Sequence, residues 1–520
     1  MNDALRARAL RVASALLAAL FVVNAAPRLG HFSGDAIIHL SIAERAAAGH
    51  WFEFNPGEVA SGSTSFAWTL LESTLLRLGS MSLLVWVIPA VDLAALVASG
   101  VMVRHLALKT GASRPAATLA GLVFAALPAI TYNALLGMEN IVHVLAALGA
   151  VALAARPAST RRDLALGVLI GVAATLRPEG VLLGALPLLA LRDGPDRGAA
   201  LRSLLRVSLA ALAVYAPSVW VHWRVTGHVV PGSGVSRLMA VRREPLSLHL
   251  AGPLWVYLSA ASRFVVYLPI TLLAAAGAGE TPPTDEGRVI RRAAVSLFAL
   301  GLALYTFGTG AAHVGRLTQW LFALLAVLLA RGVDRALRWG EAGRTRLAAV
   351  ALLAAVHALL CAGETAARMR DITQIRGGWD REMILGRAAR RGPETDRLLR
   401  ALCAGGCCAS GVTPTVAVVE AQLRYDYDER VRISSLDGRT SAASGRGVLR
   451  FDARGCPELE PALAAPEVVG VMEPPLAQLA RCGGGAPTAR ARTEAWGGLA
   501  EVPGWRWAPS LPGWTRVCAR

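Results

Sequence analysis

The segment Gly34-Asp35-Ala36-Ile37-Ile38-His39 follows the first hydrophobic run of the chain, residues 9–26, and precedes the polar stretch Ser61-Gly62-Ser63-Thr64-Ser65-Phe66-Ala67-Trp68. Apolar residues recur with helical spacing from Ile37 to Ala43, which is typical of a helix lying on a membrane surface. The sequence therefore predicts that the Asp35 carboxylate lies at the start of such a helix, at the mouth of a membrane bundle. A plainer alternative is that Asp35 is an N-cap that satisfies backbone donors.

The composition is that of a polytopic α-helical membrane protein. Hydrophobic residues make up 54% of the 520 residues, charged residues 17%, and the mean hydropathy is +0.47. The net charge of +17 comes from arginines that recur between apolar runs and do not form one basic stripe. This pattern is expected for cytoplasmic loops beside a lipid bilayer, and it argues against a nucleic acid partner.

The lengths of the apolar runs predict about eleven membrane spans, several of them short. The runs are 9–26, 82–103, 116–136, 140–155, 164–176, 179–191, 207–223, 253–276, 293–309, 317–330 and 347–362. The apolar run 64–78 is interrupted by Glu72 and Arg77. We therefore expect this run to form a helix along the membrane interface and not a span.

The charges flanking the runs predict the orientation. Arg6, Arg8 and Arg11 place the N-terminus in the cytoplasm, provided that the first run is an uncleaved span and not a signal peptide. The same parity brings five basic clusters to the cytoplasmic side: Arg104/Lys109/Arg114, Arg156/Arg161/Arg162, Arg192/Arg197/Arg202/Arg206, Arg288/Arg291/Arg292 and Arg331/Arg335/Arg338/Arg344/Arg346. It places the first loop (27–81) and everything after about residue 363 on the external face.

The chain divides into a transmembrane domain at 1–362 and an external, periplasmic α/β domain at 363–520. Helical periodicity at 382–402 is followed by strand-like runs at 416–419, 431–433 and 468–471. Six cysteines lie in this part: Cys403, Cys407, Cys408, Cys456, Cys482 and Cys518. An external domain with these cysteines is predicted to contain disulfides, with a metal site at the first three as the weaker alternative.

The predicted external face gathers the candidate functional residues. Glu139 precedes a span, and Arg177 and Glu179 flank Pro178 between two short runs. That spacing predicts either a broken helix pair lining a cavity or an ion pair that supports the turn. The arginines of this face are suited to holding a phosphate at a water boundary. They are Arg177, Arg224, Arg237, Arg242 and Arg316.

These motifs, in this order, resemble the GT-C superfamily of membrane glycosyltransferases. The first-loop pattern comprises Asp35-Ala36-x-Ile38, Ala48-Gly49-His50, Asn55-Pro56-Gly57-Glu58 and Ser61–Trp68, and it is followed by Gly137-Met138-Glu139, Arg177-Pro178-Glu179-Gly180, Thr226-Gly227, Gly315-Arg316 and Ile433–Gly438. The pattern is most similar to the branch that contains the terminal arabinofuranosyltransferase of mycobacterial arabinan synthesis. The resemblance covers most of the chain.

The resemblance implies an enzyme of the bacterial inner membrane. It would transfer a sugar from a polyprenyl-phosphate donor to an acceptor hydroxyl on a glycan, lipid or protein at the external face, usually with inversion. Asp35 would be the general base, and Glu139 would orient the acceptor or support Asp35. Arg316, Arg237, Arg224 and Arg177 would hold the donor phosphate, while His39, Glu179, Asn55 and Glu58 would bind substrate or support the site.

Other readings of the sequence stay open. Relatives often carry two acidic residues where this chain has Gly34-Asp35, and Leu317 replaces an aromatic residue after Gly315-Arg316, so an inactive relative is one alternative. A transporter or flippase for a lipid-linked glycan, which needs charges buried within spans, is another. A non-catalytic envelope scaffold is the third. A divalent ion held by Asp35 and Glu139 also stays open, beside catalysis through arginine alone.

Overall fold

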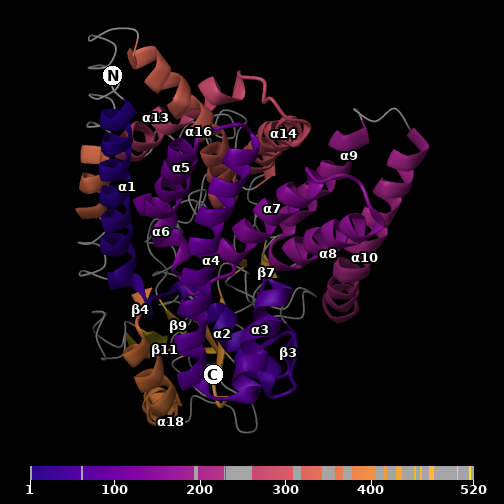
Figure 1. The fold of residues 1–520 in the computed structure, drawn as a ribbon. Helices are drawn as coiled ribbons and strands as arrows, with labels where there is room; N and C mark the ends of the chain where they lie inside the picture. The colour runs from indigo at the N-terminus through magenta and orange to yellow at the C-terminus, as the bar shows by residue number, and fades with distance from the viewer. Residues whose placement is uncertain are drawn as a thin grey trace.

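The computed structural model describes residues 3–59, 63–191, 197–227, 229, 261–308, 318–341, 358–366 and 378–403. Of the remaining chain it describes short pieces at 415–418, 425, 429–435, 450–451, 457–458, 468–472, 500–501 and 514–516. Helices dominate the described part. In Figure 1 a helical bundle occupies the upper part of the view, and a smaller layer of short helices and strands lies below it.

The first loop builds half of the lower layer. Helix α1 (Asp3–Ala25) and the 3-10 turn η1 (Ala26–Arg28) lead into β1 (Phe32–Ser33), α2 (Gly34–Ala47), the hairpin of β2 (Glu53–Asn55) and β3 (Glu58–Val59), and α3 (Phe66–Leu78). The N-cap of α2 is Ser33, whose Oγ accepts a hydrogen bond from the Ala36 N–H at 3.1 Å. Asp35 therefore lies in the first turn and is not the cap.

Helix α3 has the bounds expected of an interfacial helix. Its 13 residues are about 20 Å long, too short for a span, and it lies beside α2 at the lower end of the bundle (Figure 1). The bundle itself follows in chain order: α4 (Met81–Lys109), α5 (Arg114–Ala126), α6 (Pro128–Ala134), α7 (Asn140–Ala154), α8 (Thr160–Leu176), the 3-10 helix η2 (Pro178–Ala185), α9 (Leu186–Leu191), α10 (Arg197–Thr226), α13 (Ala261–Ala278), α14 (Asp285–Gly308), α16 (Gln319–Glu341) and a helix at 358–366.

Several predicted spans are shorter or more broken than the sequence indicated. Among the described helices, α4 and residues 198–225 of α10 are long and apolar enough to cross a membrane. The predicted span 116–136 is divided into α5 and α6, which meet at 58° because Pro128 cannot continue the backbone hydrogen bonding of α5. The run 179–191 is likewise divided into η2 and α9. The total of about eleven spans stays a prediction.

Close helix contacts in the bundle depend on small residues. A Cβ added at Gly167 of α8 would lie 2.4 Å from the Val207 carbonyl oxygen of α10, and one at Gly332 of α16 would lie 1.8 Å from the Leu273 oxygen of α13. Neither position has room for a side chain. Packing of this kind holds apolar helices together where lipid removes the hydrophobic driving force.

Basic loops meet at the upper end of the bundle. Lys109 pairs with Glu286 at 2.8 Å, Arg331 pairs with Glu280 at 2.9 Å, and the Ser113 N–H donates to Asp334 at 2.7 Å. Three of the basic clusters that the sequence assigned to one side therefore flank loops that contact one another. That this side is cytoplasmic stays a prediction.

The described part of the C-terminal region contains α18 (Arg381–Cys403) and a mixed five-stranded sheet. Its strand order is β10 (Ala500–Glu501), β11 (Trp514–Arg516), β9 (Val468–Met472), β5 (Thr415–Val418) and β6 (Arg432–Ser435), and two further strands, β7 (Arg450–Phe451) and β8 (Pro457–Glu458), form a separate pair. Strand β5 is parallel to β6 and β9. The helix and three of these strands lie on the segments that the sequence indicated. Of the six cysteines predicted to form disulfides, Cys403 is the last residue of α18 and the other five lie outside the described residues, while Cys361 is a buried free thiol.

The C-terminal region packs against the first loop. Phe32 and Ser33 of β1 pair with Trp379 and Gly378 of β4 (Gly378–Trp379), and Arg391 of α18 forms an ion pair with Glu44 of α2 at 2.8 Å. Arg45 also pairs with Glu429. Both regions therefore lie at the same end of the bundle, opposite the loops around Lys109 (Figure 1).

Candidate functional site

A buried ion-pair network joins the facing ends of α7 and α8. Arg177 is the C-cap of α8, and its Nη1 donates to Glu139 Oε1 at 2.6 Å and to the Asn140 side chain, while its Nε donates to Glu179 Oε1 at 2.6 Å. Glu139 is the N-cap residue of α7. The sequence left open whether the Arg177 turn lines a cavity or is supported by an ion pair. The structure contains the ion pair between Arg177 and Glu179, and Glu139 is a second partner of Arg177.

Two further carboxyl groups lie buried near this network. Glu72 of α3 is 1% exposed and Asp92 of α4 is 0% exposed, and both interact electrostatically with Glu139. Burial raises the pKa of Glu72 well above its usual range, and the nearby carboxylates of Glu139 and Asp92 raise it further. In the sequence, Glu72 and Arg77 served only to mark the run 64–78 as an interfacial helix. The signal for this site was an acid within an apolar run.

The backbone turn before Glu139 is held by hydrogen bonds on two sides. Asp92 Oδ2 accepts a hydrogen bond from the Gly137 N–H at 3.0 Å, and the Leu136 carbonyl accepts one from the Ser33 N–H at 2.9 Å. Gly137 has a φ of 72°, and a Cβ there would lie 2.3 Å from the Phe32 ring. The strand that leads into Asp35 thus rests on the turn that leads into Glu139.

Asp35 and His39 stand on one side of α2, since they are four residues apart. Asp35 is partly exposed in the first helical turn, where the N-terminal end of the helix favours a negative charge. His39 is buried, and its Nδ1 lies 3.3 Å from Ser63 Oγ. Asp35 is therefore accessible to solvent, whereas His39, one turn further along the same face of α2, is buried beside Ser63.

The other predicted site residues are spread more widely. Asn55 is fully buried in β2, Glu58 lies in β3, and Arg224 is exposed near the end of α10. Arg237, Arg242 and Arg316 lie outside the described residues. Helix α16 begins three residues after Arg316. The ring of its Trp320 meets the His143 ring of α7 edge to face, with 6.3 Å between the ring centroids.

The buried carboxyl groups do not form a metal site. Within the described ranges, no group of three or more histidine, cysteine, aspartate or glutamate side chains is arranged to hold a metal ion. Glu72, Asp92 and Glu139 influence one another electrostatically but do not form a ligand set. The described part of the chain thus offers no closed cage for the divalent ion that the sequence left open.

Comparison with known proteins finds similarity in structure. No protein-family model matches the chain, and no curated protein matches it by sequence. Among solved structures, the chain is similar to ArnT from Cupriavidus metallidurans bound to undecaprenyl phosphate, with a TM-score of 0.57 and 14% identity over 97% of each chain. A second match is the Archaeoglobus fulgidus oligosaccharyltransferase in complex with zinc and sulfate, with a TM-score of 0.46 and 14% identity over 89% of this chain and 67% of that one.

The similarity to ArnT extends over almost the whole of both chains, so it includes the first loop, the helical bundle and the C-terminal region together. At 14% sequence identity, this similarity is evidence of a shared fold and of nothing finer. It does not distinguish the arabinofuranosyltransferase branch, which stays a prediction. The chain therefore shares the fold of ArnT, while its place in the GT-C superfamily stays a prediction from the sequence motifs.

Proposed function

We propose that the protein is a membrane glycosyltransferase that moves a sugar from a polyprenyl-phosphate donor to an acceptor hydroxyl on a glycan, lipid or protein at the external face. The observation that carries the proposal is the placement of Asp35. The aspartate lies on the short helix α2 at one end of an ArnT-like helical bundle, and Ser33 hydrogen-bonds to the backbone turn before Glu139. ArnT itself was solved with undecaprenyl phosphate bound, which supports a donor of that class.

The proposed reaction needs one base and one anion-binding group. Asp35 takes the proton of the acceptor hydroxyl as that oxygen attacks the anomeric carbon of the donor sugar. The bond from the anomeric carbon to the phosphate oxygen breaks, and polyprenyl phosphate leaves with the electron pair. Attack from the face opposite the phosphate inverts the anomeric carbon. Asp35 suits the role because it is partly exposed in the first turn of α2, where the N-terminal end of the helix favours a negative charge.

The arginines divide into two groups in this proposal. Arg316, Arg237 and Arg224 hold the donor phosphate and stabilise the charge that develops on it as it leaves. Arg177 was also assigned to the phosphate, but its guanidinium donates to Glu139, Asn140 and Glu179. We therefore assign Arg177 to the support of Glu139, and Glu139 to the orientation of the acceptor. His39, Asn55, Glu58 and Glu179 support these groups.

A transporter for a lipid-linked glycan is the second candidate, and one observation favours it. Asp92 is fully buried in the long apolar helix α4, as a transport path through the bundle requires. Its Oδ2, however, accepts a hydrogen bond from the backbone of Gly137, which is a structural use of the carboxyl group. Net movement of a lipid-linked sugar across sealed vesicles, without sugar transfer, would favour this candidate.

The test is transfer by the full-length protein in lipid nanodiscs, supplied with undecaprenyl-phosphate sugars and methyl glycosides as acceptors. The product is measured as released undecaprenyl phosphate. Asp35→Asn should lower the rate by about 10²–10⁴-fold, the usual loss of a general base. Asp285→Asn is the matched control, because Asp285 is an exposed carboxylate at the opposite end of the bundle. Equal rates for Asp35→Asn and the unchanged protein would overturn the proposal.

A further inference from the structure

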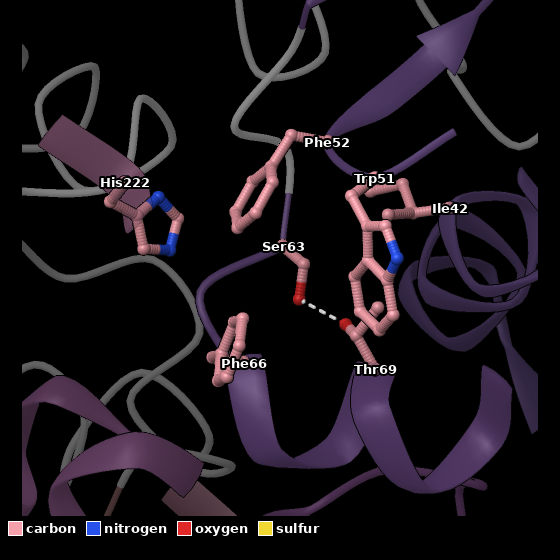
Figure 2. Close-up of a pocket in the computed structure, with 7 residues that line it drawn as sticks. All are labelled: Ile42, Trp51, Phe52, Ser63, Phe66, Thr69 and His222. Carbon is pink, nitrogen blue, oxygen red and sulfur yellow. Dashed lines mark hydrogen bonds between the residues drawn. The ribbon is translucent and has the colours of Figure 1, made fainter. Parts of the chain in front are cut away.

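The face of helix α2 that carries Asp35 is packed by the first loop beyond its first turn. Asp35, His39 and Ile42 are spaced four and then three residues apart, so they lie along this face. His39 Nδ1 lies 3.3 Å from Ser63 Oγ. Figure 2 shows Ile42 beside the Trp51 indole, next to a gap that has room for about one water molecule. Of the three α2 residues on this face, Asp35 is the one that is partly exposed.

The opposite face of α2 packs against residues of the C-terminal region. Ile37, Leu40 and Glu44 lie along it, spaced three and then four residues apart. At about 3.6 residues per turn, this face is centred about 170° around the helix from the first face. Ile37 and Leu40 are buried in one hydrophobic cluster with Ile384 of α18 and with Tyr425. The C-terminal region therefore helps to set the rotation and the depth of α2.

Two ion pairs hold the C-terminal end of α2 to the same region. Glu44 pairs with Arg391 of α18 at 2.8 Å, and the neighbouring Arg45 pairs with Glu429. Arg391 is held in place by Tyr425, since its Nε donates to the Tyr425 carbonyl at 2.7 Å and its guanidinium lies 4.0 Å from the ring centroid. An arginine fixed by these contacts presents its charge at a defined position. Glu44 therefore has a fixed partner outside the first loop.

The N-terminal end of α2 is held through the strand that precedes it. Phe32 and Ser33 of β1 pair with Trp379 and Gly378 of β4, and α18 begins two residues after β4 ends. Ser33 is also the N-cap of α2. Asp35 lies two residues after this strand pair. The C-terminal region therefore holds α2 near both of its ends and on the face opposite Asp35.

We propose that the C-terminal region positions the base, and that Glu44 and Arg391 are positioning residues for sugar transfer. The inference rests on the proposed function, in which Asp35 is the base. The ion pair fixes α2, and α2 fixes the carboxylate relative to the acceptor hydroxyl. None of the arginines assigned to the donor phosphate lies in α2. Loosening α2 should therefore slow the chemical step without weakening the hold on the donor.

The test uses the full-length protein in nanodiscs. The kcat is measured from released undecaprenyl phosphate, and the Kd of undecaprenyl phosphate is measured separately by microscale thermophoresis. Glu44→Arg and Arg391→Glu each place like charges together and should lower kcat about tenfold or more, because a misplacement of about 1 Å costs up to about 10²-fold. The Kd should stay unchanged. The double variant Glu44→Arg/Arg391→Glu restores opposite charges and should be faster than either single variant.

Two further variants complete the comparison. Glu44→Gln removes the attraction without introducing repulsion, so it should lower kcat less than Glu44→Arg does, and it carries the test if a reversed charge prevents folding. Glu286→Arg is the matched control. Glu286 forms a partly exposed ion pair with Lys109, also at 2.8 Å, at the opposite end of the bundle. This control should change neither kcat nor the Kd of undecaprenyl phosphate.

The outcomes separate this inference from the proposed function. If the unchanged protein transfers no sugar, the proposed function is wrong and this inference falls with it. If the unchanged protein transfers sugar and the charge-reversed variants keep their kcat, or the double variant is no faster than the single ones, the positioning inference alone is wrong. A Kd that weakens as much as kcat falls would show a general disturbance of the fold and would also overturn it.

Discussion

Asp92 of α4 accepts a hydrogen bond from the backbone N–H of Gly137, with 3.0 Å between Oδ2 and the nitrogen. The bond ties the middle of the bundle to the turn that carries Glu139. The same turn accepts a bond from Ser33, two residues before Asp35. The two carboxylates of the candidate site are thus positioned through one piece of backbone, and changes within that piece should affect both stability and transfer.

Replacement of Asp92 tests this connection. Asp92→Leu leaves the buried Gly137 N–H without its acceptor, which should lower the free energy of unfolding by about 1–3 kcal/mol. Asp92→Asn keeps a carbonyl oxygen and should lose much less. The measurement is the thermal midpoint in detergent, together with the transfer rate. If Asp92→Leu is as stable and active as the unchanged protein, the turn does not depend on this bond.

Gly137→Ala should destabilise the same turn in a second way. The added Cβ would meet the Phe32 ring at 2.3 Å in a backbone conformation that costs an L-residue about 1–2 kcal/mol. Gly49→Ala is a matched control, because Gly49 has a φ of 95° and no atom within 4 Å of a Cβ. We expect Gly137→Ala to lower the thermal midpoint more than Gly49→Ala does. Equal losses would mean that contact with Phe32 is unimportant.

Arg177 should be more sensitive than any exposed arginine. Arg177→Met leaves Glu139 and Glu179 buried without their positive partner, a change that typically costs about 3–5 kcal/mol. Adding Glu139→Gln to Arg177→Met removes one of the uncompensated charges and should restore part of the loss. Chemical unfolding of the single and double variants measures both effects. Additive losses would show that Arg177 and Glu139 do not interact as the ion pair requires.

The buried carboxyl group of Glu72 should make the free energy of unfolding depend on pH. Because burial raises its pKa above the usual 4.5, the folded state binds a proton more tightly than the unfolded state. The unfolded state therefore gains relative stability as pH rises from about 4.5 towards the raised pKa. The free energy of unfolding should fall over that window, and Glu72→Gln should remove this part of the fall. Thermal midpoints of both proteins between pH 4 and pH 8 provide the measurement; parallel curves would contradict it.

The sequence predicted the parts of this fold that depend on local pattern. The apolar run at 82–103 became α4, the interrupted run at 64–78 became the short helix α3, and the strand-like run at 416–419 overlaps β5. These elements have clear periodicity or clear flanking charges, so short stretches are enough to identify them. The runs 116–136 and 179–191 were predicted as single spans but are divided, and for 116–136 the effect of Pro128 on an apolar helix depends on how its neighbours pack.

The candidate site was predicted less completely, for a physical reason. Glu139, Arg177 and Glu179 could be grouped because their flanking runs placed them on one face, and they do lie in one network. Glu72 and Asp92 are 20 residues apart on different helices, and their approach to Glu139 depends on tertiary packing that no local pattern contains. The His39–Ser63–Thr69 chain depends in the same way on how the first loop closes on itself.

The two ends of the bundle should face opposite sides of the membrane. Ala48 after α2 and Ala389 in α18 are exposed at one end of the bundle, and Thr281 before α14 is exposed at the other. If the first loop is external, a membrane-impermeant maleimide added to intact cells should label Ala48→Cys and Ala389→Cys above the wild-type level. Thr281→Cys should react only after the membrane is permeabilised. Labelling of Ala48→Cys and Thr281→Cys from the same side would contradict the spanning arrangement, because the bundle places these positions at opposite ends. Labelling of Thr281→Cys alone in intact cells would reverse the orientation and place Asp35 at the cytoplasmic face, which the proposed external reaction excludes.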